Sequence, residues 1–165
     1  MAACIFCSIV GGEAPSVTLI RDDTCTAFLD IHPVSRGHAL VVPNQHAAFL
    51  TDLPVDVQRH LLAVAASVLA AQRRCGLSAE GANLLLNDGT AANQHIPHVH
   101  IHVLPRARRD GALLVARLAG RVFNVFGRGA PWQELEATAS LIRPFIEPRD
   151  LRHGRGFDPA ERGRE

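Results

Sequence analysis

Short runs of apolar, largely β-branched residues separated by polar turns recur between residues 17 and 104. Runs of about four to eight such residues are typical of strands. We expect strands at 17–21 and 25–29, joined as a hairpin by Asp22-Asp23-Thr24, and further strands at 38–43, 83–86 and 99–104.

One long segment has helical periodicity instead. It begins at Pro54, which suits a first helical turn, and ends before Gly76. Its apolar stripe consists of Val57, Leu61, Val64, Val68 and Leu69. His60 lies off this stripe, so we expect its side chain to be solvated. With a short helical turn at 4–10, the pattern predicts an α+β fold of five antiparallel strands and one main helix.

The pattern changes after residue 109. We expect helices at 112–118 and from Pro131 to Glu147, followed by an arginine- and glycine-rich tail without stable structure. The predicted organisation is therefore a domain at 1–109, a C-terminal helical extension at 110–147 and a disordered tail at 148–165. Trp132 and Phe145 are candidate anchors of the extension.

Histidines alternate with β-branched residues along the last predicted strand. His98, His100 and His102 are separated by Val99 and Ile101. Because alternate residues of a strand share a face, one face would carry three imidazoles and the other would enter the core. Imidazole serves as nucleophile, acid, base or metal ligand near neutral pH, so this pattern predicts a site.

The composition of the chain excludes several classes of function. The chain of 165 residues is 47% hydrophobic and 20% charged, with a formal net charge of +1, which does not indicate a nucleic-acid-binding surface. The sequence has neither an apolar run long enough to cross a membrane nor a secretion signal, so we expect a cytoplasmic protein. All 17 basic residues are arginine, which excludes lysine Schiff-base chemistry and a Walker-type phosphate loop.

Two of the four cysteines have a chemically informative spacing. Cys4 and Cys7 are separated by two residues, as in metal sites and redox pairs, although two buried thiols would give the same pattern. Cys25 and Cys75 have the context of small buried hydrophobic residues.

The histidine pattern resembles the His-x-His-x-His-x-x signature of the histidine triad (HIT) superfamily of nucleotide hydrolases and transferases. Supporting motifs occur in the family's order over residues 4–106. They are Cys4-Ile5-Phe6-Cys7, Ala27-Phe28-Leu29-Asp30-Ile31, Gly37-His38-Ala39-Leu40-Val41-Val42-Pro43, Asn87-Asp88-Gly89 and Gln94. The resemblance implies a dimer that joins two five-stranded sheets into one. The C-terminal extension would then either reinforce this pairing or cover the base pocket.

The resemblance also implies roles for individual residues. His100 would be the nucleophile that attacks the α-phosphorus, forming a phosphoramidate that water later cleaves. The groups expected to donate to the phosphate are His38, Asn87, Gln94 and His102. Asp30 would accept a hydrogen bond from a ribose hydroxyl. Phe6, Ile9, Ile31 and Leu40 match the base pocket of the family, although such residues also suit plain core packing.

His95 departs from the family pattern. In the phosphoramidase branch this position often carries a hydroxyl that helps to protonate the leaving group. A histidine is able to act as the general acid there, or its side chain simply faces solvent.

The resemblance also bears on the paired cysteines. Bacterial-type members with this pair often bind zinc through two cysteines and two histidines, here Cys4, Cys7, His46 and His98. Zinc with four protein ligands is structural, because no position remains open for a substrate. A redox pair and two buried thiols are the alternatives.

The leading hypothesis is a hydrolase of nucleoside monophosphate derivatives, with a purine nucleotide such as an adenosine phosphoramidate as substrate. A dinucleoside polyphosphate hydrolase is the alternative, because His102-Val103-Leu104-Pro105-Arg106 also resembles that branch. A nucleotide-binding regulatory protein with little turnover is a second class. In a third, weaker interpretation, His98, His100 and His102 together bind a catalytic metal.

Overall fold

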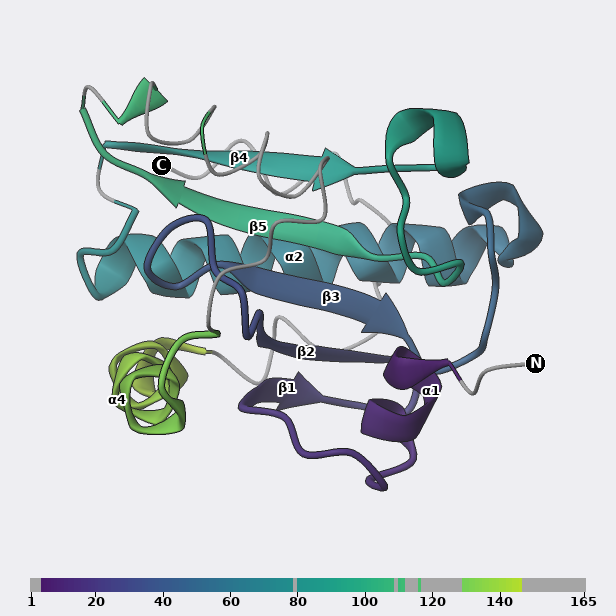
Figure 1. Ribbon diagram of the computed structural model, residues 1–165, viewed down its shortest axis with the longest axis horizontal. Helices are drawn as coiled ribbons and strands as arrows, with labels where there is room; N and C mark the ends of the chain where they lie inside the picture. The colour runs from purple at the N-terminus through teal and green to yellow at the C-terminus, as the bar shows by residue number, and fades with distance from the viewer. Residues whose placement is uncertain (1–3, 79, 109, 112–115, 117–128, 147–165) are drawn as a thin grey trace, which may run out of the picture.

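A computed structural model of the chain describes residues 4–78, 80–108, 110, 111, 116 and 129–146. Its centre is an antiparallel sheet of five strands in the order β1-β2-β3-β5-β4 (Figure 1). The strands are β1 (Thr18–Arg21), β2 (Cys25–Leu29), β3 (Ala39–Pro43), β4 (Gly81–Leu86) and β5 (Ile101–Arg106). The predicted α+β class and the five-stranded antiparallel sheet are confirmed.

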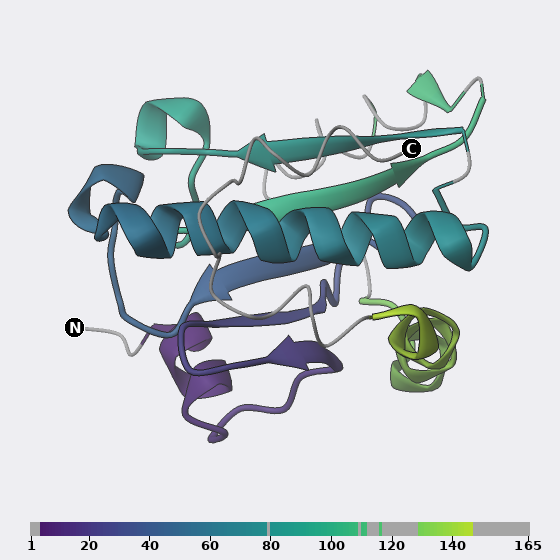
Figure 2. The same ribbon diagram turned by 180° about the vertical axis from the view of Figure 1, so that it is seen from behind.

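The main helix, α2 (Val55–Arg74), covers one face of the sheet (Figure 2). Leu61, Val64 and Val68 of its predicted stripe are fully buried and join Val41 and Val103 of the central strands in the main core. The helix is therefore held by burial of one apolar face, as its periodicity predicts.

His60 of α2 is buried, not solvated as expected, with 6% of its surface exposed. Its Nε2 lies 2.7 Å from Oδ2 of Asp22, in the turn between β1 and β2. The prediction was wrong because the apolar stripe reports only where the helix meets the sheet. The hairpin turn also packs against α2 and supplies a polar partner there.

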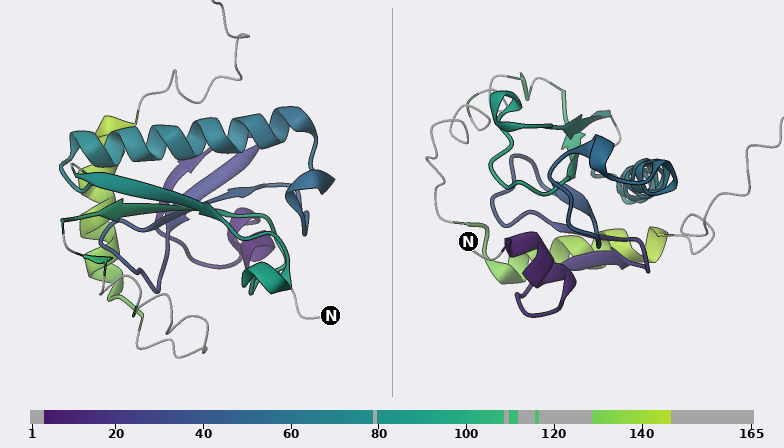
Figure 3. Two further views of the ribbon diagram at one scale, coloured as in Figure 1. Left: turned by 90° about the horizontal axis from the view of Figure 1, so that it is seen from above. Right: turned by 90° about the vertical axis from the view of Figure 1, so that its right-hand side faces the viewer.

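The opposite face of the sheet carries the short helix α1 (Ile5–Val10), as Figure 3 shows in the view from above. Phe6 and Ile9 of α1 pack with Phe28, Leu40 and Val42 in a second, smaller apolar cluster. With both faces covered, β2 and β3 are buried along their whole length. This second face also borders the cavity described below.

The second predicted C-terminal helix is present as α4 (Trp132–Ile142), followed by the 3-10 turn η3 (Arg143–Phe145). It lies beside β1 and also contacts α2 (Figure 1). Leu135, Ala139 and Ile142 are buried in the main core, so α4 is an integral part of the packing. The expected helix at 112–118 falls largely, and the tail at 148–165 entirely, outside the described residues.

Two further 3-10 turns, η1 (Leu50–Asp52) and η2 (Thr90–Ala92), lie in the loops before α2 and before β5. None of the helices in the described part of the chain combines the length and apolar character needed to span a bilayer.

Candidate functional site

The alternating histidines lie at the start of β5 and on the segment that leads into it. Val99, Ile101 and Val103 enter the main core on the α2 side. His98 and His100 instead contact the ring of Phe6 in α1, with ring centroids 5.7 and 5.2 Å away. The alternation therefore separates imidazoles from core residues as predicted, although the regular strand begins only at Ile101.

His100 is 94% buried and has a defined tautomer. Its Nδ1–H donates to the backbone oxygen of His98 at 2.8 Å, because a carbonyl oxygen can only accept. The neutral ring then carries its lone pair on Nε2. This arrangement suits a nucleophile, since the attacking nitrogen is unprotonated while the other holds the ring in place.

His102 belongs to a buried chain of polar groups. Its Nδ1 lies 2.9 Å from Nε2 of His38, so a single proton is shared between the two rings. The Nδ1 of His38 faces two groups, the N–H of Val34 at 3.4 Å and Oδ2 of Asp30 at 3.4 Å. Asp30 also accepts the N–H of His32 through Oδ1 at 2.8 Å. These contacts fix the ring of His102 and link it, through His38, to the carboxylate of Asp30.

A cavity of about 740 Å³ opens beside these histidines on the α1 side of the sheet. Most of the residues predicted to bind the nucleotide line it, namely Phe6, Ile9, Asp30, Ile31, His38, Leu40, Asn87, His95, His100 and His102. Small-molecule sites commonly have this character, an apolar wall with a few convergent polar groups.

Gln94 is the predicted nucleotide-binding residue that does not line the cavity. Its Oε1 accepts the N–H of Gly89 at 2.7 Å, and its Nε2 donates to the backbone oxygen of Ala48 at 2.9 Å. The side chain thus ties the loop before β5 to the segment before η1. This loop carries Asn87 and Asn93, which both line the cavity. Gln94 therefore stabilises the loop that positions them.

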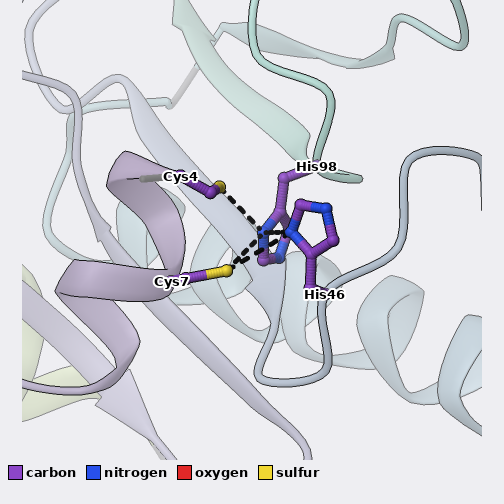
Figure 4. Close-up of side chains that lie close together, drawn as sticks. All are labelled: Cys4, Cys7, His46 and His98. Atoms are coloured by element: carbon purple, nitrogen blue, oxygen red, sulfur yellow. Dashed lines mark hydrogen bonds between the residues drawn. The ribbon is translucent and has the colours of Figure 1, made fainter. Parts of the chain in front are cut away.

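The four residues predicted as metal ligands converge from three segments (Figure 4). The Sγ of Cys7 lies 3.3 Å from Nδ1 of His46 and 3.6 Å from Nδ1 of His98. The Sγ of Cys4 lies 3.4 Å from Nδ1 of His98, and the two Nδ1 atoms are 3.2 Å apart. Tetrahedral zinc, with bonds of about 2.0–2.3 Å, places its ligand atoms about 3.3–3.8 Å apart, so the set fits this metal.

The surroundings of the cluster favour the ligand form of His98. Its Nε2–H donates to the backbone oxygen of Pro43 at 2.9 Å, which leaves the lone pair on Nδ1, the nitrogen that faces the cysteines. Burial, with smaller contributions from His46 and His100, lowers the pKa of His98 and keeps the ring neutral. Burial and the neighbouring Cys4 raise the pKa of Cys7, which favours its protonated thiol form.

The interpretation of the three strand histidines as one catalytic metal site is wrong. Among the described residues, the groups close enough to share an ion place His98 with Cys4, Cys7 and His46, and His102 with Asp30 and His38. The Nδ1 of His98 faces Cys4, Cys7 and His46, whereas Nδ1 of His100 is bonded to a backbone oxygen and Nδ1 of His102 to the ring of His38.

Several residues of the cavity wall were not predicted from the sequence. Phe28 is the cross-strand partner of Leu40, so strand pairing would have revealed it once the register was known. Ile5 lies beside the predicted Phe6. Trp132 also lines the cavity, which agrees with the alternative in which the extension covers the base pocket, although no local pattern places this side chain there.

An antiparallel sheet that presents alternating histidines to a cavity defines a histidine triad protein. The chain belongs to the HIT domain family, whose sequence profile matches residues 11–109.

Three similar proteins place the chain within this family. An "uncharacterized HIT-like protein" of Mycobacterium tuberculosis is 37% identical over 147 residues, covering 89% of this chain and 95% of that protein. The adenosine 5′-monophosphoramidase of Saccharomyces cerevisiae is 38% identical over 114 residues, covering 69% of each chain. The crystal structure of a zinc-bound histidine triad family protein from Mycobacterium smegmatis superposes with a TM-score of 0.71 at 34% identity, covering 87% of this chain and 93% of that one.

Proposed function

We propose that the protein hydrolyses nucleoside monophosphate derivatives, with adenosine phosphoramidates as the substrate class, through a nucleotidyl intermediate on His100. The observation that carries this proposal is the hydrogen bond from Nδ1–H of His100 to the oxygen of His98. It leaves a neutral Nε2 beside a cavity of a size that suits a small molecule. The name of the yeast relative supports the choice of substrate.

The first step forms a bond between Nε2 of His100 and the α-phosphorus and breaks the bond to the leaving amine. The ring becomes positively charged, and the carbonyl of His98 stabilises this charge through the proton on Nδ1. His102 donates from Nε2 to a phosphate oxygen, in the tautomer in which its Nδ1 accepts the N–H of His38. The exposed His95 at the cavity protonates the leaving group.

In the second step a water molecule attacks the phosphorus and gives a proton to His95, which lost its own in the first step, while the bond from phosphorus to Nε2 breaks and leaves its electron pair on the ring. The products are a nucleoside monophosphate and the neutral His100 ring, which is ready for another cycle. Asp30 accepts a ribose hydroxyl, Asn87 donates to the phosphate, and the side chains of Phe6, Ile9 and Leu40 contact the base.

The substitution His100→Asn tests the proposal, because it removes the nucleophile and leaves a polar side chain of smaller size. We expect turnover of an adenosine phosphoramidate to fall by about 10³-fold or more, with the affinity for AMP nearly unchanged. Unchanged turnover would rule out His100 as the nucleophile. Absence of turnover in the wild-type protein, with AMP still bound, would favour the regulatory binding protein. Faster turnover of a diadenosine polyphosphate would redirect the substrate assignment.

We further propose one structural zinc ion on Cys4, Cys7, His46 and His98. The distances between their ligand atoms and the bond from His98 to Pro43 support it, as does the zinc in the similar mycobacterial protein. With four protein ligands the ion would crosslink α1 to the segments before α2 and β5 and take no part in bond breaking.

A further inference from the structure

Part of the cavity wall comes from outside the histidine triad domain. The family match ends at residue 109, whereas Trp132 is the first residue of α4. Its side chain lines the cavity and is 44% exposed. Ile5 and Ile31, which also line the cavity, are 48% and 51% exposed. Three large apolar side chains are therefore half-exposed around a single cavity.

The segment before α4 is held against the loop that follows β2 and contains Asp30. The N–H of Ala130 donates to the backbone oxygen of Ile31 at 2.8 Å. A Cβ at Gly129 would lie 3.0 Å from that same oxygen and 3.5 Å from Cε1 of His32, so the close approach favours a glycine. The segment therefore ties the backbone two residues before Trp132 to Ile31.

The body and the C-terminal end of α4 are also anchored. Leu135 and Ile142 are 5% and 0% exposed within the main core. The guanidinium of Arg143 donates to the backbone oxygen of Thr18 at 3.0 Å. Since both ends of the helix are fixed, the backbone of Trp132 has a defined place at the cavity wall.

We propose that Trp132 is a nucleoside-binding residue whose indole stacks on the outer face of the bound base. The inner face of the base would rest on the buried Phe6 and Leu40, so the base would lie between two apolar layers. Large apolar side chains left half-exposed around a cavity gain free energy when a flat ligand covers them. Base–aromatic stacking is worth enough for its loss to weaken binding by about fivefold or more. The proposal rests on the proposed nucleotide hydrolase function and extends it to the C-terminal segment.

The composition of the chain allows a direct test, because Trp132 is its single tryptophan and tyrosine is absent. Indole fluorescence therefore reports on this residue alone. Titration of the full-length protein with AMP should quench or shift the emission along the same saturation curve that calorimetry gives for AMP binding.

Three variants separate stacking from a structural effect. Trp132→Ala should raise KM for an adenosine phosphoramidate by about five- to tenfold with kcat changed less than about twofold. Trp132→Phe should recover most of the loss, because it keeps an aromatic face. Leu141→Ala is the matched control, since Leu141 is equally exposed on the same helix but does not line the cavity, and its KM should match the wild type.

The outcomes distinguish this proposal from the function on which it rests. If AMP binds by calorimetry while the indole emission and the KM of Trp132→Ala stay at their original values, Trp132 does not contact the base, and the hydrolase proposal stands. If Trp132→Phe is as impaired as Trp132→Ala, the indole has a packing role instead. If calorimetry detects no AMP binding in the wild-type protein, both proposals are wrong.

Discussion

At the scale of the residue, the hydrogen bond made by one ring nitrogen of an imidazole determines whether the other nitrogen carries a proton or a lone pair. His98 donates from Nε2 to Pro43 and therefore presents Nδ1 to the cysteines. His100 donates from Nδ1 to His98 and therefore presents Nε2 to the cavity. Two histidines that are two positions apart thus have opposite tautomers, and in each case a backbone carbonyl selects the tautomer.

The environment of Asp22 predicts how the stability of the protein depends on pH. Its carboxylate accepts the N–H groups of Thr24 and Cys25, both at 2.8 Å, and lies 2.7 Å from Nε2 of His60. Burial by itself raises the pKa of Asp22, but the hydrogen bonds from Cys25, His60 and Thr24 outweigh it and lower the pKa below its usual value. The ionised carboxylate therefore stabilises the fold above the unfolded pKa of about 3.9, and this contribution is lost as the pH falls through the folded value.

We predict that Asp22→Asn lowers the free energy of unfolding by about 1–2 kcal/mol near neutral pH. The difference from the wild type should shrink below about pH 4, where the wild-type carboxylate is itself protonated. Denaturant unfolding at several pH values measures both effects. Asp23→Asn, an exposed neighbour in the same turn, should change stability by less than about 0.5 kcal/mol. A deficit of Asp22→Asn that is independent of pH would contradict the assignment.

Individual residues show which features of the site can be predicted from the sequence and which cannot. Alternation at 98–103 predicts which side chains enter the core, because a strand has a fixed period of two. It does not predict partners. His60 finds Asp22 across the fold, and Gln94 turns toward Gly89 and Ala48 because of the loop conformation. Neither contact is reflected in the periodicity of the sequence, so the partners of these two side chains are known only from the folded backbone.

At the scale of the element, α1 is a short helix that needs external support. Six residues are too few for an isolated helix in water. The guanidinium of Arg21 donates to the backbone oxygens of Ile9 and Val10 at its C-terminal end, at 3.0 and 3.2 Å. At its other end the helix carries the cysteines of the proposed zinc site. Since Phe6 lines the cavity, support of α1 is also support of the nucleotide site.

Metal analysis of the freshly purified wild-type protein should therefore find about one zinc per chain, and the double substitution Cys4→Ser, Cys7→Ser should abolish it. Hydrogen exchange of the amides of α1 should become faster in the variant, because the crosslink to His46 and His98 is lost. Cys75→Ser is the matched control and should keep both the metal and the protection. A wild-type protein without zinc, or a double variant that retains it, would refute the site.

Elements differ in how well their sequence predicts them. The hairpin of β1 and β2 and the helix α2 follow from apolar periodicity and turn residues, and their ends shift by at most one residue from the expected positions. β4 begins two residues earlier than expected, at Gly81, because it pairs with β5 as far as Arg106. Pairing partners determine the ends of such strands, and a single sequence does not contain them.

At the scale of the whole molecule, the two edges of the sheet have different surroundings. The β1 edge is partly covered by the C-terminal segment, since Arg143 donates to the backbone oxygen of Thr18. The β4 edge has no strand beside it among the described residues. Leu84 and Leu85 of β4 are each 37% exposed. An open strand edge with exposed apolar side chains favours pairing with a second chain.

The dimer implied by the family resemblance should therefore form through β4, with the two sheets joined edge to edge. We predict that light scattering gives twice the chain mass for the wild-type protein and that Leu84→Arg shifts it toward a single chain, because an arginine at this edge places like charges opposite each other across the two-fold axis. Leu84 does not line the cavity, so any loss of activity in this variant would indicate that the site depends on assembly. Leu141→Arg adds the same charge to α4 and is the control; light scattering should still give twice the chain mass for this variant. A wild-type protein of one chain mass at micromolar concentration, or a Leu84→Arg variant that stays paired, would show that the β4 edge is not the interface.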